Sequence, residues 1–291
     1  MSKAPQGVRW WPAPAKLNLL LHVTARREDG YHDLQTVFQL LDWGDELKLE
    51  TTRDPAIERA SGPAAIAPED DLCVRAARLL QRVTRVQQGV RIHLRKRIPL
   101  GGGLGGGSSD AATVLLVLDR LWGSALGTAA LCQLGLELGS DVPVFVQGSS
   151  AWAEGRGERL TPLELPERWY LIIHPGVAVG TREIFQAPEL TRNSPIITIR
   201  AASAALGSGH GARNDCEPVV RRSFPPVAAA LAWLAVRASA HLSGTGSCIF
   251  AAFARAADAE RVAAQVPDEW TSYVARGVNR SPLADALATW C

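Results

Sequence analysis

The sequence has 291 residues, of which 47% are hydrophobic and 21% are charged, and its formal net charge is +2. This composition is typical of a globular chain with one large or two medium domains and argues against an intrinsically disordered one. The small net charge indicates neither a nucleic acid nor an anionic membrane as partner, and no apolar run reaches the roughly 20 residues of a membrane-spanning helix.

The cysteines and histidines indicate neither a disulfide framework nor a metal site. Cysteine occurs five times, an odd number, and no C-x-x-C pair is present. The six histidines form neither an H-E-x-x-H pattern nor a cluster with ligand spacing, so we assign no metal-ligating residue. This cysteine usage fits a reducing compartment, and we expect a cytoplasmic protein without nucleic-acid or membrane partners.

The N-terminal region predicts a series of strands. Between Ala15 and Thr24 apolar and polar residues alternate, which places Lys16 and Asn18 on the same face of a strand. The following stretch YHDLQTVFQLLDWGDELKLE predicts further strands, with a hairpin around Trp43–Asp45.

A helix and a strand then lead into a glycine-rich loop. The segment DDLCVRAARLLQRVT, Asp70–Thr84, has helical spacing and an acidic start, and GVRIHLRKR alternates as a strand. The basic end of this strand, Arg95–Arg97, directly precedes the loop. It is either a solvated strand end or part of an anion site.

The glycine-rich loop is the strongest functional signal in the sequence. The stretch PLGGGLGGGSSDAATVLLVLDRLW, residues 99–122, has six glycines in seven positions and continues into an almost wholly apolar helix. We expect Ser108 and Ser109 to cap this helix and Asp110 to lie in its first turn. Bare backbone beside a helix N-terminus favours phosphate binding over a flexible linker or a purely structural turn.

Further helices and strands follow. Thr128–Leu138 predicts a helix ended by Gly139, and VPVFV predicts a strand, with Asp141 in the tight junction between them. A second domain is expected to start near Pro166, which divides the chain into residues 1–165 and 166–291.

The second region predicts a small sheet with helices. Its strand-like segments are WYLIIH, CIFAAFA and Tyr273–Arg276. Helices are expected at the end of PGVAVGTREIF, over Pro225–Ala238 and near Asp258–Ala264, whereas SGTGS is a glycine turn and Ala201–Arg213 a mobile loop.

Three common glycine-loop proteins do not fit the sequence. The loop matches G-x-G-x-x-G, but a dinucleotide-binding unit needs a strand after the helix, and here another helix follows. No Gly-Lys-Ser/Thr closes the run as in a Walker A loop, and neither H-R-D nor D-F-G of the protein kinases occurs.

A family resemblance covers nearly the whole chain. PLGGGLGGGSSDAA resembles the second motif of the superfamily of galactokinase, homoserine kinase, mevalonate kinase and phosphomevalonate kinase, while PAKLNL and SGTGS resemble its first and third. More narrowly, PAKLNLLLHVTARREDGYHDLQTVFQLLDWGDEL, GSDVPVF, NDCEPVV and LSGTGSCIF together resemble the 4-diphosphocytidyl-2-C-methyl-D-erythritol kinases of the non-mevalonate isoprenoid pathway.

The resemblance implies a fold and a reaction. The fold is α+β, with an N-terminal domain like ribosomal protein S5 domain 2, a ferredoxin-like C-terminal domain and an active cleft between them. The reaction transfers the γ-phosphoryl group of ATP, with Mg²⁺, to the 2-hydroxyl of the cytidyl substrate. Phosphoryl transfer asks mainly for positioning and charge stabilisation.

The resemblance also implies site residues. Lys16 and Asp141 match the family's catalytic lysine and aspartate, with Asp141 accepting the hydroxyl proton. The ATP-binding set is Asp71, Lys96, Pro99, Leu100, Gly101, Gly102, Gly103, Leu104, Gly105, Gly106, Gly107, Ser108 and Ser109. The substrate-binding set is Asn18, Tyr31, His32, Asp141, Thr181 and Phe185.

Some features remain open at the level of the sequence. Asp71 stands where the family pattern has asparagine, and an ionised aspartate cannot donate a hydrogen bond to adenine. Ser109 is a candidate Mg²⁺ contact, with water and phosphate oxygens supplying the rest. The chain is expected to be a monomer or a homodimer. Another small-molecule kinase of the superfamily and a non-catalytic nucleotide-binding protein remain as alternatives.

Overall fold

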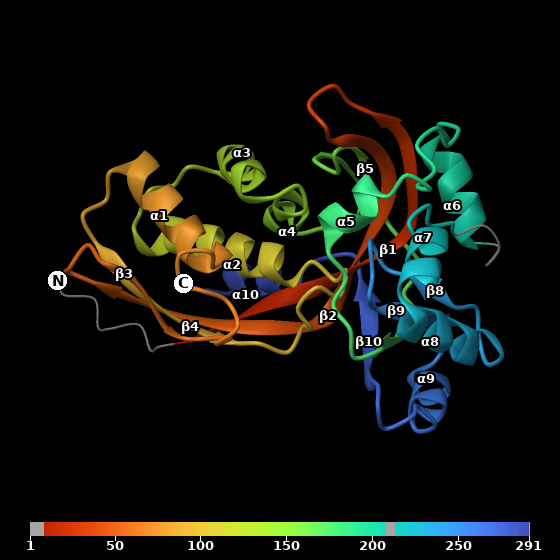
Figure 1. Ribbon diagram of the computed structural model, residues 1–291. Helices are drawn as coiled ribbons and strands as arrows, with labels where there is room; N and C mark the ends of the chain where they lie inside the picture. Colours follow the sequence, from red (N-terminus) through yellow and green to blue (C-terminus); the bar gives the residue numbers. More distant parts are fainter. Residues whose placement is uncertain (1–8, 208–212, 291) are drawn as a thin grey trace.

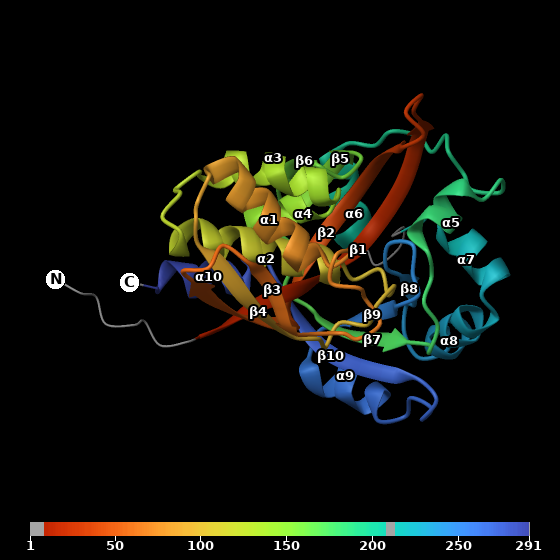
Figure 2. The same ribbon diagram turned by 60° about the vertical axis from the view of Figure 1, so that its left-hand side comes forward.

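The computed structural model describes residues 9–207 and 213–290. Within them the chain folds into two α+β domains, as predicted, which meet along the long strand β2 (Figures 1 and 2). The N-terminal strands and helices are β1 (Trp10–Arg26), β2 (His32–Thr52), β3 (Ile57–Ser61), α1 (Leu72–Thr84), β4 (Gly89–Arg95), α2 (Gly106–Leu121), α3 (Thr128–Leu138), α4 (Val142–Gln147), β5 (Ala151–Gly155) and β6 (Arg159–Pro162).

Strand β2 organises the N-terminal sheet. It pairs antiparallel with β1, β4 and β5, and β3 adds to the edge in parallel with β4. Helices α1 to α4 cover one face of this sheet (Figure 1). Helix α2 is central to the packing, because side chains such as Ala111, Leu115 and Leu118 are completely buried in the core. This rigid burial holds the N-terminus of α2 in one place.

The C-terminal part has the βαββαβ chain order of a ferredoxin-like domain. Its helices and strands are β7 (Trp169–His174), α5 (Thr181–Gln186), α6 (Ile199–Gly207), α7 (Glu217–Ser223), α8 (Pro225–Ala235), β8 (His241–Leu242), β9 (Ile249–Phe253), α9 (Ala256–Ala263), β10 (Thr271–Val278) and α10 (Pro282–Ala288). The strands lie in the order β10-β7-β9-β8, and α8 and α9 pack on one face.

The two domains share a core. The second face of the C-terminal sheet, with Ile172 and Phe250, packs against Leu17 and Leu41 of β1 and β2. At the C-terminal end, β10 pairs with β2, and α10 packs into the N-terminal core through Leu283. The chain therefore crosses back over the boundary that we predict at residue 165.

Two sequence predictions are wrong in the N-terminal domain. Residues 43–45 form no hairpin, since β2 continues through them opposite β1. A Cβ on Gly44 would lie 2.1 Å from the Ala13 carbonyl oxygen, so this glycine permits a close approach between strands rather than a turn. The apolar run VPVFV is helix α4, not a strand, because a short run buried on all sides has no diagnostic period.

Two further predictions are corrected. Helix α2 begins at Gly106 with Gly105 as its N-cap, so Ser108 and Ser109 lie inside its first turn. The segment Ala201–Arg213 is not a loop throughout: α6 covers its alanine-rich start, as the helix propensity of alanine favours, and residues 208–212 lie outside the described residues.

Two further observations concern helix length and the cysteines. No helix among the described residues has the length and apolar character needed to cross a lipid bilayer. The cysteines that the structure describes, Cys73, Cys132, Cys216 and Cys248, are all unpaired.

Candidate active site

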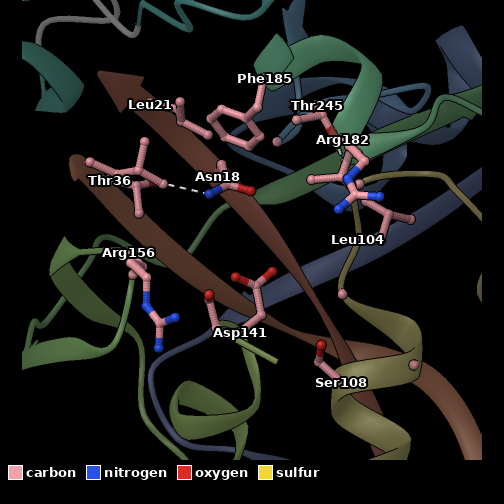
Figure 3. A pocket seen from close by; sticks show the side chains of 18 of the residues that line it. Asn18, Leu21, Thr36, Leu104, Ser108, Asp141, Arg156, Arg182, Phe185 and Thr245 are labelled. Atoms are coloured by element: carbon pink, nitrogen blue, oxygen red, sulfur yellow. Dashed lines mark hydrogen bonds between the residues drawn. The ribbon is translucent and has the colours of Figure 1, made fainter. Parts of the chain in front are cut away.

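A cavity of about 810 Å³ lies where the two domains meet. Strands β1 and β2, the glycine-rich loop, the start of α2, the turn after β5, helix α5 and the SGTGS loop all line it (Figure 3). Most of the residues predicted for the site share this one cavity: Lys16, Asn18, Tyr31, His32, Lys96, residues 99–108, Asp141, Thr181 and Phe185. Asp71 and Ser109 do not line it.

Lys16 and Asp141 form an ion pair inside the cavity. The Lys16 Nζ lies 3.3 Å from Asp141 Oδ2, and the two side chains are 3% and 32% exposed. The ammonium also donates to Asn18 Oδ1, and Asn18 Nδ2 donates to Thr36 Oγ1 at 2.8 Å. These bonds fix the amide of Asn18 with its oxygen toward the lysine.

Local backbone structure explains why these side chains meet. Lys16 and Asn18 are two residues apart on β1 and so project from the same face. The Lys16 N–H donates to the Leu104 carbonyl at 3.0 Å, which ties the strand to the glycine-rich loop. Asp141 occupies the N-cap position of α4 but makes no side-chain capping bond, so its carboxylate is free to face the lysine.

The glycine-rich loop is bonded to the SGTGS loop of the other domain. The carbonyls of Gly101 and Gly102 accept from the N–H groups of Ser247 at 3.1 Å and Cys248 at 3.0 Å. Ser243 Oγ donates to the Gly103 carbonyl at 3.0 Å. The loop is thus held from both domains.

The start of α2 presents backbone donors to the cavity. Gly105 has φ +73°, a left-handed conformation that a glycine adopts without strain, and it turns the chain into the helix. The first N–H groups of a helix have no intrahelical acceptor, and here Gly106, Gly107 and Ser108 line the cavity. This end of the helix is suited to a phosphate group. Ser109 is completely buried and is not in contact with the cavity.

Lys96, close to this loop, is held by two aspartate side chains. Its Nζ lies 2.6 Å from Asp45 Oδ2 and 2.7 Å from Asp110 Oδ2. Asp45 Oδ1 also accepts from the backbone N–H groups of Arg97 and Ile98. Burial raises the pKa of Asp110 to about 8, against the lowering effect of Lys96. Among described residues, the other oxygen of Asp110 has no hydrogen-bond partner. The predicted contact of Lys96 with adenine remains a prediction.

Asp71 lies at a second, smaller cavity of about 210 Å³. Its Oδ1 accepts from the Cys73 N–H and caps α1, and its Oδ2 accepts from Arg59 at 2.9 Å. Both oxygens are therefore engaged within the protein. Leu72, Lys96, Leu100 and Gly107 line both cavities, so the two adjoin. The predicted contact of Asp71 with adenine also remains a prediction.

Aromatic rings lie at the other end of the main cavity. The rings of His32 and Phe185 are stacked, with centroids 5.2 Å apart and an interplanar angle of 26°. Arg192 Nε donates to His32 Nε2 at 3.1 Å. Burial, and after it the charge of Arg192, lowers the pKa of His32, which keeps the imidazole neutral near pH 7. Tyr31 beside it is 52% exposed.

Several lining residues are absent from the sequence prediction. Thr245 belongs to the SGTGS motif, and its Oγ1 lies 3.2 Å from Thr181 Oγ1, so the motif itself could have indicated it. Arg182 follows Thr181 directly in the chain. Thr36 and Arg156 carry no local signal, because only strand pairing brings Thr36 beside Asn18 and only the turn after β5 brings Arg156 to the cavity.

Comparisons with known proteins show which family this sequence resembles. The family model for the N-terminal domain of GHMP kinases matches residues 71–149, and that for their C-terminal part matches residues 196–272. A 4-diphosphocytidyl-2-C-methyl-D-erythritol kinase of Chromohalobacter salexigens is 54% identical over 95% of this chain and 93% of its own length. A kinase of the same name from Halorhodospira halophila is 53% identical over 96% of each chain.

A solved structure is similar over the same extent. The crystal structure of a 4-(cytidine 5'-diphospho)-2C-methyl-D-erythritol kinase has a TM-score of 0.80 and 35% identity, and the match covers 93% of this chain and 100% of that one. The similarity therefore extends over both domains.

Proposed function

We infer the reaction from the family of this chain. The chain belongs to the GHMP kinases, and within them to the family of the 4-diphosphocytidyl-2-C-methyl-D-erythritol kinases. It is a small-molecule kinase. We propose that it transfers the γ-phosphoryl group of ATP to the 2-hydroxyl of 4-diphosphocytidyl-2-C-methyl-D-erythritol, as a step of isoprenoid precursor synthesis in the cytoplasm.

The observation that carries this proposal is the Lys16–Asp141 pair within a cavity that also contains a helix N-terminus and stacked rings. Asp141 would accept the proton of the attacking hydroxyl. Lys16, 3.3 Å away, would orient that carboxylate and stabilise the charge that develops on the transferred group. Asn18, whose amide is fixed by its hydrogen bond to Thr36, would position the substrate hydroxyl relative to the Lys16 ammonium.

The two substrates would enter from different sides. The N–H groups at the start of α2 would bind the ATP phosphates. The adjoining smaller cavity, with Asp71 and Lys96 on its wall, would take the adenine. The cytosine would lie against Tyr31 and Phe185, with His32 at its polar edge, and Thr181 would contact the substrate beside them.

Magnesium would accompany ATP. Among the described residues, no group of three or more histidine, cysteine or acidic side chains could hold a metal ion. Ser109 does not reach the cavity, whereas the Ser108 hydroxyl does. Phosphate oxygens and water would therefore supply most ligands, as Mg²⁺ commonly accepts. The ion would neutralise phosphate charge.

An ADP-release assay tests the proposal. The purified chain is offered the cytidyl substrate, mevalonate, homoserine and galactose side by side, with ATP and Mg²⁺. We expect turnover with the cytidyl substrate alone. Turnover with mevalonate or homoserine instead would identify another kinase of the superfamily, and no turnover with any acceptor would favour a nucleotide-binding protein without catalysis.

A further inference from the structure

Three arginines that line the main cavity, Arg26, Arg156 and Arg182, have no acidic partner among the residues that the structure describes, and the charge of Arg26 acts on His32 at the ring end. The two lysines of the cavity have acidic partners: Lys16 pairs with Asp141, and Lys96 with Asp45. By contrast, Arg156 and Arg182 form no ion pair with any residue that the structure describes, although both line the cavity. Unpaired guanidinium groups in a concave site are suited to an anionic ligand.

Arg156 lies on the N-terminal wall between the rings and the catalytic pair. Its guanidinium carbon is 4.6 Å from the centroid of the Tyr31 ring. The next residue, Gly157, adjoins the catalytic carboxylate, since a Cβ on this glycine would lie 4.0 Å from Asp141 Oδ1. The turn after β5 thus places this cation between the base-binding end and the reacting end of the cavity.

Arg182 lies on the opposite, C-terminal wall. It is in the first turn of α5, three residues before Phe185, so the two side chains share a face of that helix. Figure 3 shows Arg182 extended toward Leu104 of the glycine-rich loop, with Asp141 and Asn18 between it and Arg156. Arg156 and Arg182 therefore come from different domains.

We propose that Arg156 and Arg182 bind the diphosphate of the nucleoside-diphosphate substrate from opposite walls of the cavity. This inference rests on the proposed function. A substrate with its base at Phe185 and its hydroxyl at Asp141 has its diphosphate between those points, in the part of the cavity that the two arginines flank. Guanidinium groups match phosphate oxygens in shape and in hydrogen-bond geometry. The pair would thereby select diphosphate esters over small uncharged alcohols.

Three glutamine variants, two in the cavity and one control, test the role of charge. Arg156→Gln and Arg182→Gln keep much of the length of each side chain and remove its charge. Arg78→Gln is the matched control, because Arg78 is exposed on α1 and lines neither cavity. The affinities of cytidine, CMP and CDP are measured by calorimetry for each protein, together with kcat and the KM of both substrates.

We expect each cavity variant to lose affinity in proportion to the phosphates of the ligand. Cytidine should bind within about twofold of the unaltered chain, whereas CDP affinity should fall about 10- to 100-fold, the range for a hydrogen bond to a charged group. The KM of the cytidyl substrate should rise similarly, and the KM of ATP should change little. Arg182→Lys should restore part of the loss.

Each other result contradicts the proposal. Unchanged CDP affinity in both variants, or equal losses for cytidine and CDP, would show that these arginines do not bind the diphosphate. A larger rise in the KM of ATP would assign them to the nucleotide donor. Failure of the unaltered chain to phosphorylate the cytidyl substrate would instead overturn the proposed function. The activity of the unaltered chain thus distinguishes a failure of the proposed function from a failure of the arginine proposal.

Discussion

The Nζ of Lys16 lies 3.3 Å from Oδ2 of Asp141, although the two residues are 125 positions apart in the sequence. The lysine is almost completely buried, and the aspartate is about one third exposed to the cavity. A buried ammonium needs such partners, because an unpaired buried charge is strongly destabilising. The same contact that holds the lysine in place also fixes the position of the aspartate at the cavity.

The first prediction concerns this pair. Asp141→Asn should lower kcat by about 10²- to 10⁴-fold, the usual contribution of a positioned base, while both KM values change little. Steady-state kinetics measures both quantities. Asp268→Asn makes the same chemical change at an exposed residue outside the cavity and should have no effect. A loss of less than tenfold for Asp141→Asn would reduce its role to positioning the substrate.

A second prediction separates two glycines of the loop. At Gly103, φ is +73° and a Cβ would lie 2.2 Å from the Ser243 carbonyl oxygen, so Gly103→Ala should displace the SGTGS loop and lower the melting temperature. At Gly107 a Cβ would meet only a Leu72 methyl at 3.3 Å. Gly107→Ala should therefore fold normally.

The kinetic effects of these glycine variants should differ as well. Gly107→Ala should mainly raise the KM of ATP, because its methyl group would stand beside the phosphate-binding N–H groups. Gly103→Ala should impair both substrates through the displaced loop. Equal melting temperatures for the two variants would contradict the close contact of Gly103 with Ser243.

The third prediction concerns the effect of pH on the two aspartates that contact Lys96, Asp45 and Asp110. Burial raises the folded-state pKa of Asp110 to about 8, so the folded protein binds more protons than the unfolded chain between about pH 4 and pH 8. The stability that this proton contributes is present at low pH and is lost as the pH rises through about 8. Denaturant unfolding at a series of pH values should show this decline, and Asp110→Asn should flatten it.

Asp45→Asn is the matched control for that variant. The Asp45 carboxylate accepts from two backbone N–H groups and from Lys96, so replacing it removes charge-assisted bonds and leaves the ammonium with only Asp110. We expect Asp45→Asn to destabilise the protein by about 2 kcal/mol or more and Asp110→Asn by clearly less. The reverse order would mean that Asp110 is the ionised partner.

The fourth prediction concerns the rings at the substrate end. Phe185→Ala should lower kcat/KM for the cytidyl substrate by a factor equivalent to about 1–3 kcal/mol, the contribution of one base stacked on an aromatic ring. Methylerythritol phosphate without the cytidyl group should be a very poor substrate, because binding of a remote group helps to hold the reacting centre. Its residual turnover should be the same with and without Phe185. A further loss of turnover with this truncated substrate in Phe185→Ala would indicate that Phe185 contributes to packing instead of binding the base.

Much of the fold follows from local patterns in the sequence. Alternation predicts β1 and the shared face of Lys16 and Asn18, helical spacing predicts α1 and α3, and the glycine run predicts the loop before α2. These features depend on neighbours within a few residues, which the sequence displays directly. Two of the wrong predictions, at Gly44 and in α4, involve residues whose conformation depends on a distant strand or on burial from every side.

By itself, the sequence determined the α+β class and, through its motifs, the family, and it predicted phosphate binding at the glycine-rich loop. Only the tertiary structure decided which side chains share the cavity: it placed Asp141 beside Lys16, engaged both oxygens of Asp71, buried Ser109 and brought Arg156 and Arg182 to opposite walls. The physical reason is that charge pairing and burial depend on contacts between segments far apart in the chain, and spacing along the sequence does not record them.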